Sequence, residues 1–197
     1  MHADEALNHW AKAGLPSVTA DFIEHVRRIV RRYDDHVSIV TEVAPALQAL
    51  LSTDCPHPKC SCVSEEHYSR YPLHSDELGF QVLAIAWAPG QYTPIHDHDE
   101  TWGVVGVYTG RIEVVDYLPQ RDQGNLSLMT PLSPKTASQK EIAYIVKAND
   151  RHKVGNPADQ NSVTIHVYGK ALDAVCTWTH TRENWYERQA AQLPTSE

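Results

Sequence analysis

The second half of the chain contains a succession of short β-rich segments separated by turn residues, and this succession limits the fold more than any other feature. The run FQVLAIAW, which begins at Phe80, ends at a Pro-Gly pair, and GVVGVYTGRIEVVDYL reads as two strands joined at Thr-Gly. AYIVKAND, SVTIHVYG and AVCTWTH continue the series. Short strands at near-regular spacing are typical of an antiparallel barrel or sandwich. The sequence therefore predicts a mainly β fold over about residues 67–181.

The segments on either side of this β region have a helical character. In DFIEHVRRIV the apolar residues recur at helical spacing and the basic residues lie opposite, and EVAPALQALL repeats the pattern with Pro45 in its first turn. We expect residues 1–66 to form a helical part that packs outside the β-barrel, so that residues 1–197 make a single domain. The tail, residues 182–197, is predicted to be a short helix followed by frayed residues.

Charge and hydropathy exclude several classes of partner. The net charge is −8 and no basic stripe is present, which argues against nucleic acids and anionic membranes. The longest apolar runs, such as VLAIAWA, are too short to span a bilayer. The first residues, MHADEALNHWAKAG, lack the basic and apolar regions of a secretion signal. We therefore expect a cytoplasmic protein without nucleic-acid or membrane partners.

The four cysteines agree with a reducing compartment. Three of them, Cys55, Cys60 and Cys62, lie in CPHPKCSC, and Cys176 stands alone. The spacing of the first three fits none of the common zinc patterns. A Pro-rich connector with reduced thiols is therefore favoured over a metal-binding knuckle.

A His-x-His pair in PIHDHDETWG is the first candidate functional feature. Side chains two residues apart on a strand point to the same face, so His96 and His98 share a face that Asp97 does not. Two unpartnered imidazoles inside a small barrel would be costly, and a bound metal ion removes that cost. The alternative is that they are exposed loop residues, since the chain contains twelve histidines. We favour the metal site.

A third ligand has to come from another part of the chain. His152, in NDRHKVGNP, follows the predicted strand AYIV at a turn that can face the His-x-His strand in an antiparallel barrel. Glu100 shares the parity of His98, so a site with two histidines and one carboxylate is the other arrangement that the spacing allows.

The histidine motifs resemble those of the cupin superfamily. Residues 90–110 are similar to the first cupin motif, and residues 152–156 to the end of the second. Most cupins carry a glutamate four or five residues after the second histidine, where this chain has Trp102 and Gly103. The resemblance implies a cupin-type antiparallel β-barrel, a small jelly roll, with three histidines and no carboxylate around the metal.

A more specific resemblance is to thiol dioxygenases, and most closely to bacterial cysteine dioxygenases. It runs from about Tyr68 to Cys176 and includes Tyr-Ser-Arg, which ends at Arg70, 26 residues before His96. IHDH is similar to the ligand strand of that family. TIHVYG is similar to its Ser-x-His-x-Tyr motif, with threonine in place of serine at position 164.

The resemblance implies a role for each of these residues. His96, His98 and His152 would hold Fe(II). Arg70, a planar fork that stays charged, would bind the substrate carboxylate, and Tyr68 would add a hydrogen bond to it. On the strand TIHVYG the phenol of Tyr168 would stabilise a bound oxygen species or donate a proton, His166 would hold the phenol, and Thr164 would orient His166. The partners implied are a small thiol and O2, and the protein is expected to be a monomer or a weak homo-oligomer.

Differences within the family bear on an expected cross-link at position 103 and on the expected substrate. Gly103 stands where mammalian-type enzymes have a cysteine that cross-links to the tyrosine, so no thioether to Tyr168 is expected. Arg70 and Thr177 differ from the glutamine and arginine of relatives that prefer 3-mercaptopropionate. These choices favour L-cysteine, oxidised to cysteine sulfinic acid.

Other functions stay open at this point. The same chemistry could act on another small thiol, such as 3-mercaptopropionate, mercaptosuccinate or cysteamine. A metal-binding cupin without redox chemistry, such as an isomerase or a ligand sensor, is an alternative of a different class. A purely structural cupin would have no use for three histidines.

Overall fold

The computed structural model describes residues 17–53, 63–146 and 150–193 of the chain. Two helices come first, α2 (Ser17–Arg32) and α3 (His36–Leu50). Twelve strands follow in the described residues: β1 (Ser69–Ser75), β2 (Gln81–Trp87), β3 (Ile95–His96), β4 (Gly103–Thr109), β5 (Arg111–Gln123), β6 (Leu126–Pro131), β7 (Lys135–Ser138), β8 (Ile142–Ile145), β9 (His152–Gly155), β10 (Ser162–Tyr168), β11 (Ala174–Arg182) and β12 (Trp185–Gln192).

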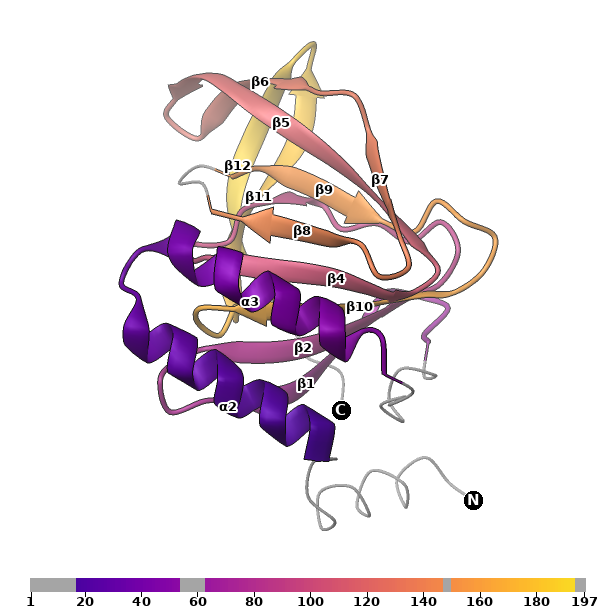
Figure 1. The fold of residues 1–197 in the computed structure, drawn as a ribbon. Helices are drawn as coiled ribbons and strands as arrows, with labels where there is room; N and C mark the ends of the chain where they lie inside the picture. Colours follow the sequence, from indigo (N-terminus) through magenta and orange to yellow (C-terminus); the bar gives the residue numbers. More distant parts are fainter. Residues whose placement is uncertain (1–16, 54–62, 147–149, 194–197) are drawn as a thin grey trace.

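The strands form two antiparallel sheets that face each other (Figure 1). The first sheet has the order β1-β2-β10-β4-β8, and the second has the order β6-β12-β11-β3-β9-β5-β7. β5 is long enough to pair with three strands: its first half pairs with β7 and β9, and its second half pairs with β6. The predicted mainly β, antiparallel jelly roll is confirmed. The expected closed barrel is instead a sandwich of two sheets.

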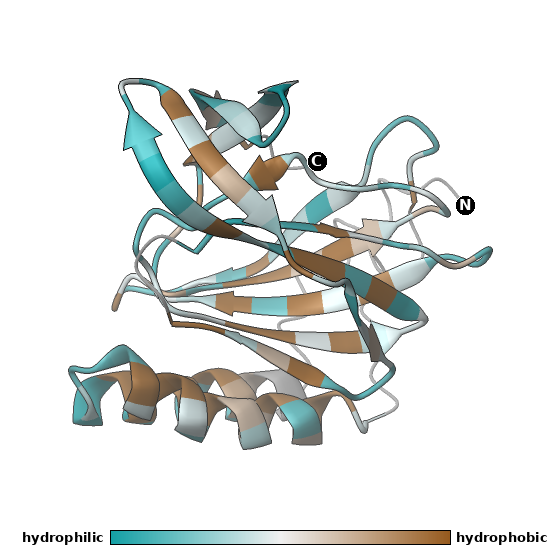
Figure 2. Ribbon diagram, turned by 90° about the horizontal axis from the view of Figure 1, so that it is seen from above, coloured by the Kyte–Doolittle hydropathy of each residue, from teal (hydrophilic) through white to brown (hydrophobic). Residues whose placement is uncertain are grey.

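The first sheet is buried on both faces because helices cover its outer side. In β2 every residue is buried. Val82, Ala84 and Ala86 pack with the helices, while their neighbours Leu83 and Ile85 belong to the cluster between the sheets. Figure 2 shows brown, apolar segments along these central strands. A strand with two apolar faces reads as a continuous apolar run, which explains the sequence FQVLAIAW.

The two helices lie side by side over the outer face of the first sheet, as the apolar spacing predicted (Figure 1). Asp35 caps the N-terminus of α3, and its carboxylate accepts a hydrogen bond from the backbone N–H of Ser38 at 2.8 Å. This cap starts the helix earlier than expected, so Pro45 lies inside the helix and not in its first turn. Gly106 on β4 allows the close approach of α3, because a Cβ there would lie 2.5 Å from the side chain of Leu51.

The predicted C-terminal helix within residues 182–197 is wrong. Residues Trp185–Gln192 form β12, which pairs with β11 along its length and with β6 at its start. Tyr186 is buried in a small apolar cluster with Ile95, Met129 and Trp178. These long-range contacts override the helical tendency of the segment ERQAAQ.

Two further sequence features can be placed only in part. Cys55, Cys60 and Cys62 lie outside the described residues, whereas Cys176 is a free, half-buried thiol on β11. In the described part of the chain, neither helix has the length and apolarity needed to cross a membrane.

A carboxylate joins the helical layer to the first sheet. Asp76, in the turn between β1 and β2, lies 2.8 Å from Nε of Arg27 on α2 and 2.8 Å from Nε2 of His74, and its side chain is fully buried. Burial raises the pKa of Asp76, but hydrogen bonds from His74, the Leu78 backbone and Arg27 outweigh it, so its pKa is lowered overall.

Asp76→Asn is expected to lower the free energy of unfolding by about 1.5–3 kcal/mol at pH 7, the range for hydrogen bonds to a charged group. A group whose pKa is lowered in the folded state stabilises above its unfolded pKa, and this contribution is lost as the pH falls through the folded value. The difference from the wild type should therefore shrink below about pH 4. Urea unfolding of both proteins measures it, with the exposed Asp21→Asn as control. An equal change in both variants at pH 7 would contradict the role of Asp76.

Candidate metal centre

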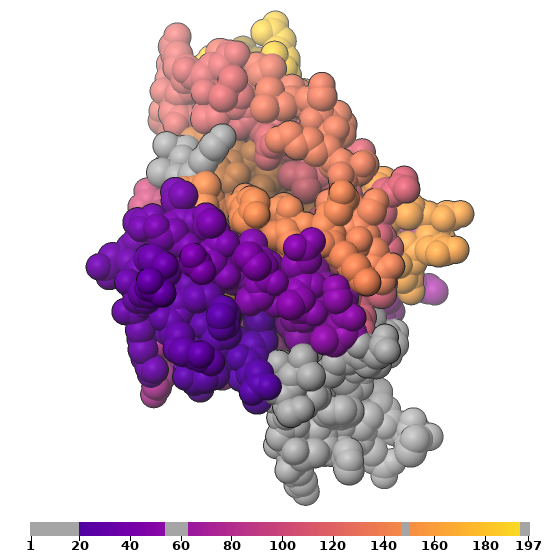
Figure 3. Space-filling view, in the orientation of Figure 1, coloured from indigo at the N-terminus to yellow at the C-terminus, as the bar shows by residue number. Residues whose placement is uncertain are grey.

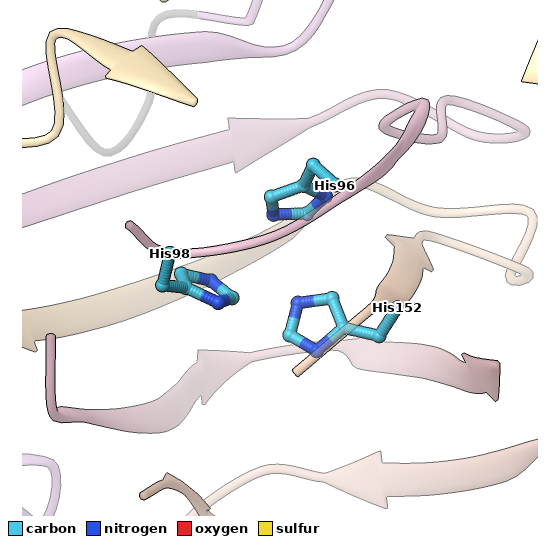
Figure 4. A group of neighbouring side chains, drawn as sticks. All are labelled: His96, His98 and His152. Atoms are coloured by element: carbon cyan, nitrogen blue, oxygen red, sulfur yellow. The ribbon is translucent and has the colours of Figure 1, made fainter. Parts of the chain in front are cut away.

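Three histidines from two segments converge between the sheets (Figure 4). His96 ends β3, His98 follows it by two residues, and His152 begins β9 directly opposite His96 in the β3–β9 pairing. Each offers a ring nitrogen within 4.8 Å of the other two. The shared face predicted for His96 and His98 is confirmed. His152, expected in a turn, lies instead at the start of a strand.

Hydrogen bonds orient two of the rings. Nδ1 of His96 lies 3.1 Å from the carbonyl oxygen of Pro94, and Nδ1 of His98 lies 2.8 Å from a carboxylate oxygen of Asp150. In each ring the Nδ1–H donates, which leaves Nε2 with a lone pair for a metal ion. Burial and the neighbouring His152 lower the pKa of both His96 and His98. Converging imidazoles are a donor set that suits a divalent transition metal.

Asp150 is a functional candidate that the sequence reasoning missed. Its carboxylate lies 2.8 Å from Nδ1 of His98 and 3.5 Å from Nδ1 of His152. Burial raises the pKa of Asp150, but its contacts with His152 and His98 outweigh this effect and hold the pKa well below its usual range. The available signal was its position two residues before His152, which places both side chains on one side of an extended segment.

Glu100 does not join the three histidines. It is exposed, lies in the left-handed region with a φ of 60°, and belongs to neither group of potential metal ligands in the described residues. The second such group consists of Asp116, Asp150 and His152. The three-histidine group fits a metal better, because Asp150 already accepts a hydrogen bond from His98 and Asp116 forms an ion pair with Lys135.

Asp150→Asn is expected to weaken metal binding about 10–100-fold, the usual effect of losing a partner that orients a ligand. The amide keeps the shape of the carboxylate but cannot hold the His98 ring in one protonation form. Competition with a chelator measures the affinity. Asp116→Asn is the matched control, and an equal loss in that variant would favour the second group.

A hydrogen-bonded row runs along β10 beside the histidines. Thr164 Oγ1 lies 2.7 Å from Nε2 of His166, and Nδ1 of His166 lies 2.8 Å from the phenol oxygen of Tyr168. All three side chains are buried, and the Tyr168 ring stacks on His98. Burial lowers the pKa of His166 well below its usual range and raises that of Tyr168. The predicted row is therefore present in the geometry.

Trp87 on β2 extends this row in a way that the sequence reasoning missed. Its indole N–H donates to Thr164 Oγ1 at 3.0 Å. β2 and β10 are paired neighbours, so the contact is a direct result of the sheet order.

Gly103 provides space for the ring of Tyr168. A Cβ at position 103 would lie 2.8 Å from Cδ1 of that ring, closer than real contacts allow. The expectation that no thioether to Tyr168 forms stays a prediction, which rests on the glycine at position 103.

Arg70 and Tyr68 lie on the inner side of the first sheet. Arg70 pairs with Ile85 across β1 and β2, and paired residues of antiparallel strands share a face. The guanidinium is buried and donates to the carbonyls of Leu193 at 2.9 Å and Leu172 at 3.2 Å. Tyr68 stacks on Trp87 with ring centroids 4.9 Å apart, and burial raises its pKa.

A cavity of about 400 Å³ opens from the histidines toward the surface. Its inner wall includes the three histidines, His166 and Tyr168, and its outer part is lined by residues of β7 and β8. The space-filling view shows this face hollowed among the orange residues of those strands (Figure 3). Among the described residues that line the cavity, Arg70 and Tyr68 do not occur. They share the sheet face with Ile85 and Trp87, which do line it.

Comparison with known proteins agrees with these features. A family model described as cysteine dioxygenase type I matches residues 10–181. Cysteine dioxygenase type 1 from Rattus norvegicus is 23% identical over 160 residues, which cover 80% of this chain and 77% of the rat protein. The Danio rerio protein of the same name is 20% identical over 166 residues, covering 83% and 80%.

Similarity to solved structures is weaker. The Cnp3 cupin domain of Schizosaccharomyces pombe has a TM-score of 0.43 and 11% identity, and the match covers 56% of this chain and 66% of that domain.

The match to the family model is extensive, since it spans most of the chain and includes all three histidines and the Thr-His-Tyr row. The chain therefore belongs to the cysteine dioxygenase type I family, a family of dioxygenases.

Proposed function

We propose that the protein is a non-haem iron(II) dioxygenase that oxidises the thiol of L-cysteine with O2 to cysteine sulfinic acid. Both oxygen atoms are added to the sulfur, so that one thiol and one O2 give one sulfinic acid without a further reductant. The convergence of three histidines beside the buried Thr164–His166–Tyr168 row carries this proposal.

The histidines fit an iron(II) ion. An ion held by His96, His98 and His152 would supply the redox capacity for combining O2 with a thiolate, which the side chains of the protein do not have. Neutral imidazoles leave the charge of a divalent ion undiminished, which favours an anionic thiolate ligand. Asp150 keeps His98 in the protonation form that can bind the ion.

Arg70 is proposed to bind the carboxylate of cysteine. Its contacts with the carbonyls of Leu172 and Leu193 fix the plane of the guanidinium, which carries five N–H donors in all. Its charge is close enough to the row that it lowers the pKa of Tyr168, although burial has the larger and opposite effect. We propose that Tyr68, two residues earlier on the same face, adds a hydrogen bond to this carboxylate.

Tyr168 is proposed to be the proton donor of the reaction. Its ring stacks on His98 and lines the cavity, so the side chain of Tyr168 lies next to one of the candidate metal ligands. Because its pKa is raised by burial, the phenol keeps its proton at neutral pH and can donate it.

Tyr168→Phe is expected to fold and to bind iron with wild-type affinity, but to lower kcat about 100-fold, the low end for general acid catalysis. Steady-state oxygen uptake with cysteine measures kcat, and a chelator titration measures iron affinity. The control is Tyr33→Phe, because Tyr33 lies between α2 and α3 and does not line the cavity. A wild-type kcat in Tyr168→Phe would make the phenol a spectator.

The cavity size favours a second candidate substrate class. A volume of about 400 Å³ is within the range of pockets for ligands larger than cysteine. A bulkier thiol acid such as mercaptosuccinate would fill more of this space. 3-Mercaptopropionate, which has no amine, tests the need for the amine, and cysteamine, which has no carboxylate, tests the need for the carboxylate.

One experiment tests the proposal directly. The full-length protein is reconstituted anaerobically with Fe(II), and oxygen uptake is then measured with cysteine, 3-mercaptopropionate, cysteamine and mercaptosuccinate. The highest kcat/KM is expected with cysteine, and mass spectrometry should detect cysteine sulfinic acid. Purified protein that retains zinc, nickel or manganese and shows no thiol-dependent oxygen uptake would favour a cupin without redox chemistry.

A further inference from the structure

The segment that supplies His152 is also held on the side of the chain that faces away from the metal centre. Asp150 and His152 both line the cavity, whereas Arg151, between them, is not among the described residues that line it. Alternate side chains of an extended segment point to opposite sides, which accounts for this difference. Arg151 is nevertheless buried, with 6% of the residue exposed. Its guanidinium therefore has partners of its own behind the ligand segment.

Two contacts hold the guanidinium of Arg151, and we call them the Arg151 clamp. Its Nη1 and Nη2 groups donate to the two carboxylate oxygens of Asp122, at 3.2 and 3.1 Å. The guanidinium also lies over the ring of Trp178, 4.6 Å from the ring centroid. Ser127 joins these two partners, because its hydroxyl group donates to Asp122 at 2.6 Å and accepts the indole N–H of Trp178 at 3.1 Å. A bidentate pair that also stacks on an aromatic ring restricts a planar guanidinium in every direction.

Backbone pairing alone gives the same segment limited support. β9 begins at His152, which is the last paired residue of the β5–β9 ladder and the single registered partner of His96 in the β3–β9 pairing. The carbonyl of Arg151 accepts a hydrogen bond from the backbone N–H of Tyr117 on β5 at 2.8 Å. β5 therefore holds Arg151 twice, by its backbone at Tyr117 and by its side chain at Asp122.

The same tryptophan supports the other ligand segment as well. Ile95, the residue before His96, is paired with Trp178 in the β11–β3 register and belongs to the same apolar cluster. Neither Ile95 nor Arg151 is among the described residues that line the cavity. Trp178 thus lies against the residue that precedes one candidate ligand on each segment. A change in the Arg151 clamp would therefore move His152 relative to His96.

We infer that Arg151 is a positioning residue of the candidate metal centre: its clamp holds His152 in the place where the three imidazoles converge. The inference rests on the three-histidine site of the proposed function and is independent of the identity of the thiol. A bidentate charge pair suits this task because it is directional. If the segment shifted, a buried guanidinium would lose its carboxylate partner, which is strongly unfavourable.

Metal affinity of the folded protein is the direct readout. Arg151→Met keeps a long apolar stem but removes the planar charge. It is expected to weaken the binding of Co(II) and Fe(II) about 10–100-fold, the range for losing a group that orients metal ligands. Competition with a chelator measures Kd on the full-length protein, at a temperature where circular dichroism shows both proteins to be folded. A wild-type Kd in Arg151→Met would overturn the inference.

The visible absorption of bound Co(II) is a readout that a loss of stability alone would not change. Its intensity and shape depend on the number and geometry of the ligands. At saturating Co(II), the spectrum of Arg151→Met is expected to differ from that of the wild type. Arg151→Lys keeps the charge and should lie between the two in both Kd and spectrum. An Arg151→Met spectrum identical to that of the wild type would mean that the ligands keep their geometry without the clamp, and the inference would fail.

Asp122→Ala tests the clamp from its other end and does not require a change at a buried position, because Asp122 is exposed. It removes both acceptor oxygens and leaves the stacking on Trp178, so a smaller loss of metal affinity is expected. In the double variant with Arg151→Met the two losses should not add, because both substitutions remove the same contact. Full addition of the losses, or a wild-type Kd in Asp122→Ala, would overturn the role of the clamp.

Arg27→Met is the matched control. Arg27 also donates to a carboxylate, that of Asp76 at 2.8 Å, but it lies on α2 in the helical layer. Its loss should lower stability while the Kd for metal and the Co(II) spectrum stay those of the wild type. An equal loss of affinity in Arg27→Met would show that metal binding follows general stability, which would contradict a specific role of Arg151.

Metal binding and oxygen uptake separate the inference from the proposed function. If the wild type binds Co(II) and Fe(II) but oxidises none of the thiols, the proposed dioxygenase activity fails, while the Kd values still decide the role of Arg151. If the wild type oxidises cysteine and Arg151→Met binds iron with wild-type affinity, the inference fails and the proposed function stands.

Discussion

His152→Ala is expected to abolish thiol-dependent oxygen uptake and to weaken Fe(II) binding by more than the roughly 100-fold attributed to partners of the ligands. His152 is the only one of the three candidate ligands that comes from β9, so its loss leaves two imidazoles from a single segment. Iron titration under anaerobic conditions measures the affinity directly. Thermal unfolding gives an independent measurement, because a ligand at 100 times its Kd stabilises the folded state by about 2.7 kcal/mol.

The iron-dependent stabilisation should be present in the wild type and absent in His152→Ala. The control is His25→Ala, which removes an exposed imidazole from α2 and should retain both the stabilisation and the activity. If His152→Ala still bound iron with wild-type affinity, the three-histidine site would be refuted, whatever the substrate.

Arg70→Ala is expected to lower kcat/KM for cysteine about 30-fold to 5,000-fold, which corresponds to about 2–5 kcal/mol for a buried charged contact. The loss should arise mainly from a higher KM, while iron content stays near that of the wild type. The physical reason is that a guanidinium fixed by two backbone carbonyls presents its charge in one orientation, without further ordering on binding.

Cysteamine provides the internal control for this variant, because it has the thiol and the amine of cysteine but no carboxylate. Arg70→Ala should leave kcat/KM for cysteamine nearly unchanged relative to the wild type. An equal loss for both thiols would show that the substitution disturbs the site generally. An unchanged KM for cysteine would remove Arg70 from substrate binding, in line with its absence from the described cavity lining.

The sequence predicts most of the fold because its periodicities are set by burial. QVLAIAW shows no alternation of polar and apolar residues, because the helices bury its outer face as well. Its apolar composition and the Pro-Gly pair that follows it still identify a strand. The tail could not be predicted in the same way. The segment after Trp185 becomes a strand because β11 and β6 offer it hydrogen-bonding edges, and no local pattern reports such partners.

The candidate site shows the same division. The spacing of two residues along an extended chain predicts that His96 and His98 share a face. It also predicts that Thr164, His166 and Tyr168 form one row. Each prediction concerns residues of one short segment, so it needs no knowledge of the strand order. The contacts of Asp150 with His98 and of Trp87 with Thr164 join residues that are 52 and 77 positions apart. Such contacts depend on the order and register of strands, which residue spacing alone does not specify.

The contact between Arg70 and the carbonyl of Leu193 spans 123 positions of the chain. During synthesis on the ribosome, all three candidate iron ligands and the whole Thr164–His166–Tyr168 row leave the exit tunnel before residue 193 does. A nascent chain stalled ahead of that residue would therefore hold Arg70 by one backbone carbonyl fewer than the released protein. The full orientation of this guanidinium can therefore form only after the candidate iron ligands and the Thr164–His166–Tyr168 row have been synthesised.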